Sequence, residues 1–180
     1  MTAHIALLRG INVGGRKKVA MGDLRALLRD LGLADPHTLL QSGNLVFRDD
    51  GRDGAHLEEL LQREAGRRLG LDTEIFVRSA REWRAIIAGN PFRAEASRDP
   101  GHLLVLLLKA APDAAKAAAL RAAITGPEQV DVRGRHAYAV YPRGIGRSRL
   151  TNALVERTLG TRATGRNWNT VLELAALAGG

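Results

Sequence analysis

The sequence contains no cysteine, few aromatic residues and no long hydrophobic run. Without cysteine, disulfides, thiolate metal ligands and a cysteine nucleophile are all excluded. No segment approaches the ~20 apolar residues that span a membrane. The early apolar run Ile5–Leu8 is also too short for the hydrophobic region of a secretory signal. We therefore expect a cytoplasmic protein with no membrane partner.

Hydrophobic residues nevertheless make up 45% of the 180 residues, which excludes intrinsic disorder. A chain of this length forms one domain or two small ones. Because only 4% of the residues are aromatic, the core has to consist mainly of Leu, Ala, Val and Ile.

The whole chain carries a net charge of +8, and acidic residues are especially scarce in two stretches. Arg9–Lys18 contains no acid and has a charge of +4. Arg133–Arg166 contains eight arginines against Glu156 alone and has a charge of +7. Such clusters raise the local potential and attract anions. The alternative is that they form two solvated basic faces that only keep the protein soluble.

The first half of the chain alternates strand and helix patterns. Leucines recur at helical spacing in two segments, and Ser42-Gly43-Asn44 is typical of a hairpin turn. The expected strands are His4–Arg9, Thr38–Gln41, Leu45–Arg48 and Thr73–Arg78, and the expected helices are Met21–Leu31 and Leu57–Leu69. The order β-α-β-β-α-β is that of a ferredoxin-like unit.

The second half repeats this order without repeating the residues. The expected strands are His102–Lys109, Gln129–Arg133, His136–Tyr141 and the extended piece Thr161–Gly165, and the expected helices are Asp113–Ile124, Arg147–Leu159 and Asn167–Leu177. The predicted class is α+β, with two ferredoxin-like (βαββαβ) sandwich halves and antiparallel sheets. Residues 1–80 and 102–180 form the halves, and residues 81–101 form a helix and linker.

The first candidate site is the glycine loop Arg9–Lys18, between a strand and a helix. Glycines allow backbone N–H groups to converge on an anion. The spacing Gly10-x4-Gly15 resembles a P-loop, but Arg16 replaces its lysine and Lys17 its Mg²⁺-binding hydroxyl, which argues against nucleotide hydrolysis of that type. The alternative is a flexible turn with solvated lysines.

The second candidate is the loop Tyr141–Asn152, which also contains glycines. The predicted helix from Arg147 places Arg147 and Arg149 at a helix N-terminus, whose partial positive charge disfavours cations unless an anion is bound. Alternatively, both side chains extend into solvent and Ser148 caps the helix.

The third candidate is Arg166–Thr170. Trp168 has the helical spacing of a core residue, with a stacking platform as the alternative. Asn167 suits a helix N-cap, which leaves Arg166 and Asn169 as ligand candidates. The scattered histidines and acids predict neither a metal site nor a cofactor site, and no catalytic group is recognisable.

Four blocks, in order along the whole chain, resemble a known family. They are Ile5–Gly15, Gln41–Asn44, Gly146–Asn152 and Arg166–Thr170. The chain thereby resembles the bacterial family called domain of unknown function (DUF) 1697. The resemblance implies a cytoplasmic bacterial protein with ferredoxin-like halves, and it implies no activity. In that family a lysine often stands where this sequence has Arg149, which keeps the charge but changes the donor geometry.

We expect a phosphate-bearing ligand, nucleic acid or nucleotide, in a basic cleft between the two halves. The expected ligand-binding residues are Arg9, Asn12, Gly14, Gly15, Lys17, Lys18, Ser42, Asn44, Arg147, Ser148, Arg149, Asn152, Arg166 and Asn169. An enzyme acting on a phosphorylated small molecule and an interaction module for an acidic protein are the alternatives. Few aromatics fall on the predicted strands, which argues against sequence-specific RNA binding.

Overall fold

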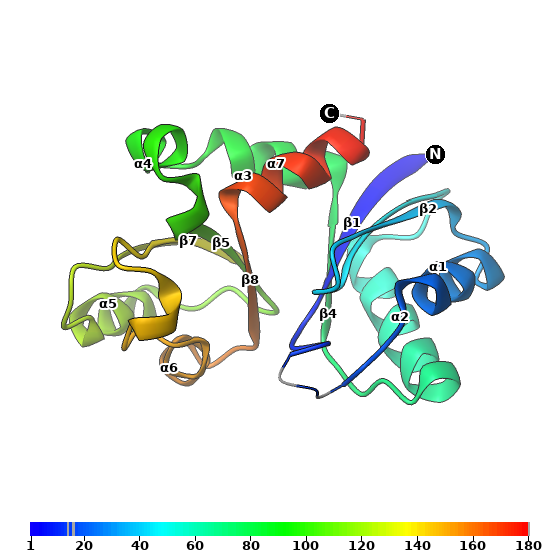
Figure 1. Ribbon diagram of the computed structural model, residues 1–180, viewed down its shortest axis with the longest axis horizontal. Coiled ribbons are helices and arrows are strands. Elements are labelled where there is room, and N and C mark those ends of the chain that lie inside the picture. The colour runs from blue at the N-terminus through cyan, green and yellow to red at the C-terminus, as the bar shows by residue number, and fades with distance from the viewer. Residues whose placement is uncertain (14, 16, 180) are drawn as a thin grey trace. The chain divides into compact units, whose positions relative to one another are not determined.

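The computed structural model describes residues 1–13, 15 and 17–179 of the chain. It divides into two compact units. The first comprises Met1–Ala85 together with Glu173–Gly180, and the second comprises Ile86–Leu172. Each unit has its own four-stranded sheet and its own apolar core, and Figure 1 gives the element labels.

The first unit has the expected ferredoxin-like topology. Its elements are β1 (Thr2–Leu8), α1 (Met21–Asp30), β2 (Ala34–Leu39), β3 (Asn44–Asp49), α2 (Gly54–Leu69), β4 (Ile75–Ser79) and the start of α3 (Ala80–Ala88). The strand order is β2-β3-β1-β4, and all pairs are antiparallel. The strand β2 is longer than expected because Asp35-Pro36 lies within it, at a register shift on the sheet edge where proline is tolerated.

Helices α1 and α2 lie side by side in Figure 1 and pack on one face of this sheet. The leucines that predicted the helices form the buried stripe: Leu24, Leu27 and Leu28 on α1, and Leu57 and Leu61 on α2. They meet alternate strand residues, such as Ala6 and Leu8. Asp53 caps α2 by accepting a hydrogen bond from the His56 backbone N–H at 2.8 Å.

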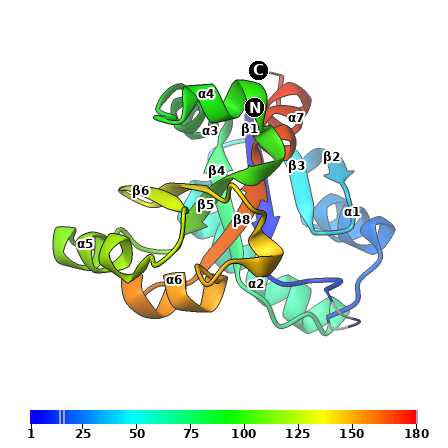
Figure 2. The ribbon, with the colours of Figure 1, turned by 60° about the vertical axis from the view of Figure 1, so that its left-hand side comes forward.

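The second unit has the same strand order in its own sheet, β6-β7-β5-β8, again antiparallel. Its elements are α4 (Arg93–Arg98), the 3-10 turn η1 (Pro100–His102), β5 (Leu103–Leu108), α5 (Ala114–Ala123), β6 (Gln129–Arg133), β7 (His136–Val140), the 3-10 turn η2 (Ile145–Arg147), α6 (Asn152–Leu159), β8 (Ala163–Asn167) and the start of α7 (Trp168–Leu177). Figure 2 shows α5 and α6 together on one side of this sheet. The predicted fold class is confirmed.

The opposite face of each sheet is buried as well. Ile5, Leu7 and Phe76 are fully buried in the first unit, and Val105, Leu107 and Tyr138 in the second. This explains why the central strands are continuous apolar runs instead of alternating patterns. The strand aromatics are therefore buried, and none of them offers an exposed stacking surface of the kind found on RNA-binding sheets.

One expected helix boundary is wrong. The helix predicted from Arg147 begins at Asn152, because Thr151 is its N-cap and accepts from the Leu154 backbone N–H at 3.1 Å. Ser148 does not cap this helix. The range expected to form a helix and linker, residues 81–101, contains most of α3, followed by α4 and the start of η1.

Both unit boundaries fall inside helices. Each of α3 and α7 follows directly on the last strand of a sheet, and the two compact units divide between residues 85 and 86 and between 172 and 173. Ser79 caps α3 through the Glu82 backbone N–H at 3.1 Å, and Asn167 caps α7 through the Thr170 N–H at 3.0 Å. Each boundary therefore lies within a continuous helix.

Candidate functional site

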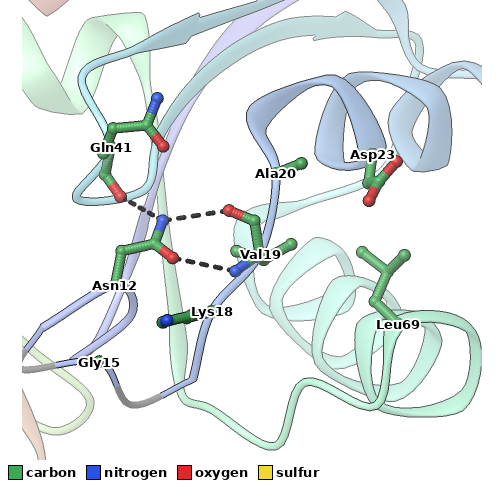
Figure 3. A pocket seen from close by; sticks show the side chains of 8 residues that line it. All are labelled: Asn12, Gly15, Lys18, Val19, Ala20, Asp23, Gln41 and Leu69. Atoms are coloured by element: carbon green, nitrogen blue, oxygen red, sulfur yellow. Dashed lines mark hydrogen bonds between the residues drawn. The ribbon is translucent and has the colours of Figure 1, made fainter.

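Asn12 organises the glycine loop after β1 (Figure 3). Its backbone φ is 53°, and its side-chain Nδ2 donates to the carbonyls of Val19 at 3.1 Å and of Gln41 at 2.7 Å. Its Oδ1 accepts from the Val19 backbone N–H at 2.9 Å. The amide thus joins both ends of the loop to the tip of the β2–β3 hairpin, and its polar atoms serve the fold.

The hairpin residues Ser42 and Asn44 also bond locally. The buried Asn44 side chain donates to the Leu39 carbonyl at 2.7 Å and to the Ser42 hydroxyl at 3.1 Å. These bonds close the hairpin turn around Gly43, whose carbonyl accepts from the Leu8 backbone N–H at 2.9 Å. The glycine loop is therefore joined to the hairpin tip, and backbone and amide groups form the connection.

A cavity of about 570 Å³ lies beside this loop (Figure 3). Its lining residues are Asn12, Gly15, Lys18, Val19, Ala20, Asp23, Gln41 and Leu69. Within the described part of this lining, Lys18 is the cationic side chain and Asp23 is its acidic counterpart. Lys17 is exposed at φ 47°, and Arg9 is half-buried with its backbone tied to Thr73 and Glu74. Gly14 and Arg16 lie outside the described residues.

The second unit holds a more basic cavity, of about 540 Å³. We call it the arginine pocket; its lining residues are Thr125, Gly126, Pro127, Glu128, Arg143, Gly144, Arg147, Ser148 and Arg149. The three arginines are exposed, and among the described residues none of them forms an ion pair or a side-chain hydrogen bond. The chain thus supplies three guanidinium groups to one concavity and leaves their donors available.

The course of the backbone between β7 and α6 explains why the guanidinium donors of these arginines remain available. Arg147 ends the turn η2, and Arg149 lies two residues before the Thr151 cap of α6. The predicted conflict between these arginines and a helix N-terminus is therefore wrong. Instead, an extended segment after η2 carries Ser148 and Arg149 along the pocket, and Tyr141 anchors it by donating its hydroxyl to the Leu150 carbonyl at 3.1 Å. Burial raises the pKa of Tyr141 to about 12, so this anchor keeps its proton.

Glu128 is a site residue that the sequence reasoning missed. The Ser148 hydroxyl donates to its Oε1 at 2.7 Å, and Ser148 Oγ accepts from the Leu150 backbone N–H at 3.0 Å. The Ser148 hydrogen bond, aided by the charge of Arg143, lowers the pKa of the Glu128 carboxyl, which is ionised at neutral pH. No motif marks this pair, since 20 positions separate the two residues.

The remaining predicted residues lie outside the described lining of both cavities. Asn152 donates from Nδ2 to the Ala163 carbonyl at 3.1 Å. Arg166 donates from Nη1 to the Thr164 hydroxyl and the Gly165 carbonyl, and burial lowers its pKa to about 10. Trp168 is 6% exposed and belongs to the core, whereas Asn169 is exposed on α7.

Within residues 1–13, 15 and 17–179, no three histidine or acidic side chains come close enough to hold a metal ion. Over the same residues, no helix combines the length and apolar character needed to cross a membrane.

Two four-stranded antiparallel sheets of ferredoxin-like topology, one of them beside an arginine-lined pocket, define an α+β protein of two similar units. The chain belongs to the family described as "Protein of unknown function (DUF1697)", whose model matches residues 1–138. That match covers the glycine loop and the hairpin, and it ends before Arg143.

A solved structure extends the likeness to the whole fold. The conserved bacterial protein SP0830 from Streptococcus pneumoniae is similar to this chain with a TM-score of 0.77 at 23% sequence identity, over 98% of each chain. This likeness supports the fold. No curated protein matches the sequence.

Proposed function

We propose that this protein binds a phosphate-bearing ligand and that the arginine pocket holds its phosphate. The observation that carries the proposal is the convergence of Arg143, Arg147 and Arg149, all without ion-pair partners among the described residues, on one cavity. A planar guanidinium group can donate two parallel hydrogen bonds to phosphate oxygens, which is called bidentate pairing. Unpaired arginines that line a concavity therefore favour an oxyanion over a neutral ligand.

The size of the pocket supports a small phosphate compound or the end of a nucleic acid strand. Small-molecule sites enclose roughly 300–1,000 Å³, and the arginine pocket is about 540 Å³. The cavity beside the glycine loop is of similar size, but its described charges are one lysine and one aspartate. The arginine pocket is therefore the stronger anion site of the two.

Calorimetric titration of the wild type with inorganic phosphate, ribose 5-phosphate and a short single-stranded RNA tests the proposal. The variant pair Arg147→Ala and Arg149→Ala should weaken binding by about tenfold or more, because hydrogen bonds to charged groups contribute ~1.5–3 kcal/mol each before solvent screening. The control is Arg121→Ala with Arg157→Ala, two exposed arginines of the same unit outside the pocket lining.

Both double variants have the same net charge, so a general electrostatic effect would lower affinity equally in the two. An equal loss, or full affinity in the pocket variant, would contradict the proposal. Preference among the three ligands then distinguishes a small phosphate compound from a nucleic acid strand.

A further inference from the structure

The arginine pocket contains an anion of its own. The Glu128 carboxylate lines the cavity and accepts the Ser148 hydroxyl hydrogen at 2.7 Å. Its oxygen Oε2 folds towards Gly126, where an added Cβ would lie only 2.4 Å from it. Within the described residues no salt bridge joins Glu128 to the three arginines, although the charge of Arg143 acts on its carboxyl.

A carboxylate is an unfavourable neighbour for a simple anion. Glu128 is ionised at neutral pH, and two negative charges at close range repel each other. An ionised carboxylate also has only acceptor capacity, whereas guanidinium groups have only donors. The pocket thus offers donors on three arginines and an acceptor on Glu128, and its best ligand has to satisfy both.

We infer that Glu128 makes the arginine pocket selective for an oxyanion that carries its own hydrogen-bond donor. Hydrogen phosphate is one such ligand, and a phosphate ester with a neighbouring hydroxyl group is another. Sulfate and phosphate esters without a hydroxyl group are disfavoured. This inference rests on the proposed function, because it concerns which phosphate-bearing ligand the same pocket selects.

The physical basis is the proton that distinguishes two ions of equal shape. Hydrogen phosphate and sulfate are both tetrahedral dianions near pH 8, but phosphate retains one proton and sulfate retains none. Phosphate can donate that proton to the Glu128 carboxylate and turn repulsion into a hydrogen bond. Sulfate leaves the carboxylate and an anionic oxygen facing each other unpaired, which is the costlier arrangement.

Calorimetric titration with inorganic phosphate and with sulfate at pH 8 tests this selectivity. The wild type should bind phosphate about threefold to tenfold more tightly than sulfate, the range expected for one hydrogen bond in a partly solvated site. Glu128→Gln should bind sulfate more tightly and bring the ratio close to one, because the amide donates to the anion. Glu95→Gln, the same change on α4 outside the pocket lining, should keep the wild-type ratio.

Gly126→Ala provides a second variant without a charge change. The new Cβ would displace the Glu128 carboxylate, so the ratio should again fall towards one. Ribose 5-phosphate compared with methyl phosphate at the same pH shows whether a ligand hydroxyl replaces the phosphate proton; the hydroxyl-bearing ester should bind more tightly.

The outcomes separate the two hypotheses. Equal affinity of the wild type for phosphate and sulfate overturns the inference while the proposed function stands. Loss of both anions in Glu128→Gln also overturns it, because Glu128 would then only organise the pocket. Failure of the wild type to bind any of these anions overturns the inference and the proposed function together.

Discussion

Gly43 lies where the tip of the β2–β3 hairpin passes over the glycine loop. Its φ is +81°, and a Cβ added there would lie 2.6 Å from Ile11 Cδ1 and 2.9 Å from Leu8 Cβ. Ile11 Cδ1 ends its side chain, but Leu8 Cβ is attached directly to the backbone of β1, so the backbone would have to move. The absence of a Cβ atom at Gly43 therefore allows the hairpin tip to pack this closely against the glycine loop.

We expect Gly43→Ala to lower the free energy of unfolding by about 2–4 kcal/mol, which combines left-handed strain with overpacking. Gly10→Ala is the matched control, since φ is +65° there and the space around an added Cβ is open. That variant should lose about 1–2 kcal/mol through strain alone. Urea denaturation measures the free energy of unfolding of both variants. Equal losses would show that the close contacts around Gly43 do not contribute to stability.

His4 is buried against Phe47 in the first unit. Its exposed fraction is 4%, the two rings stack at 5.7 Å, and neither ring nitrogen has a hydrogen-bond partner among the described residues. Burial lowers the pKa of His4, although the charges of Asp49 and Glu82 oppose the shift. The unfolded chain therefore takes up this proton more readily than the folded chain.

The linkage predicts lower stability as the pH falls below the ordinary histidine value of about 6.5. His4→Phe should reduce the loss of unfolding free energy between pH 7.5 and 5.5, measured by urea denaturation at both values. His56→Phe, at an exposed position of α2, should retain the wild-type dependence. If His4→Phe kept the wild-type pH dependence of unfolding free energy, groups other than His4 would be its cause.

At the scale of elements, helix side chains bond to one edge strand of each sheet. The strand β4 is an edge, and Glu58 and Gln62 of α2 accept from the backbone N–H groups of Val77 and Ile75, each at 2.9 Å. In the second unit, Glu156 of α6 accepts from the Ala163 N–H of the edge strand β8 at 3.0 Å. These bonds leave fewer free N–H groups for edge-to-edge association.

Glu156→Ala should lower the free energy of unfolding by about 1–3 kcal/mol, the cost of leaving a partly buried N–H unpaired. Glu156→Gln retains an acceptor oxygen and should lose less. Amide hydrogen exchange at Ala163 provides a local readout and should accelerate in the alanine variant. Unchanged exchange there would mean that Glu156 has no role at this edge.

The elements that the sequence predicted well have local causes. Leucine spacing and the Ser42-Gly43-Asn44 turn are enough to place α1, α2 and the first hairpin. The start of α6 was missed because Arg147–Leu150 has no signal that distinguishes a helix from an extended segment, and only the Thr151 cap decides it. The Glu128–Ser148 pair was also invisible, since it depends on how the loop before β6 meets the loop after β7.

At the scale of the whole molecule, the two basic clusters belong to different units and differ in how their polar groups are bonded. In the glycine loop, Asn12 is fully engaged in holding the loop to the hairpin. In the second unit, three arginines line a cavity without partners among the described residues. We therefore propose that, of the two basic clusters, the one that lines the arginine pocket binds the anion.

Salt dependence tests this division for a nucleic acid ligand. Three arginine contacts predict that log K for single-stranded RNA falls with log salt at a slope of about −2, since each contact contributes ~0.7. Lys17→Ala with Lys18→Ala should leave the slope nearly unchanged. A steeper slope that those lysine substitutions abolish would assign the binding to the glycine loop. Fluorescence anisotropy over a salt series provides the data.

The most direct test of the proposed phosphate site is chemical-shift mapping of the ¹⁵N-labelled protein during titration with inorganic phosphate. We expect the largest and saturable shifts on the backbone amides of Arg147, Ser148 and Arg149 and on that of Glu128. Amides around Asn12 and Lys18 should change little. Saturable shifts confined to the glycine loop, or no saturable shift at any amide, would contradict the assignment of the arginine pocket as the phosphate site.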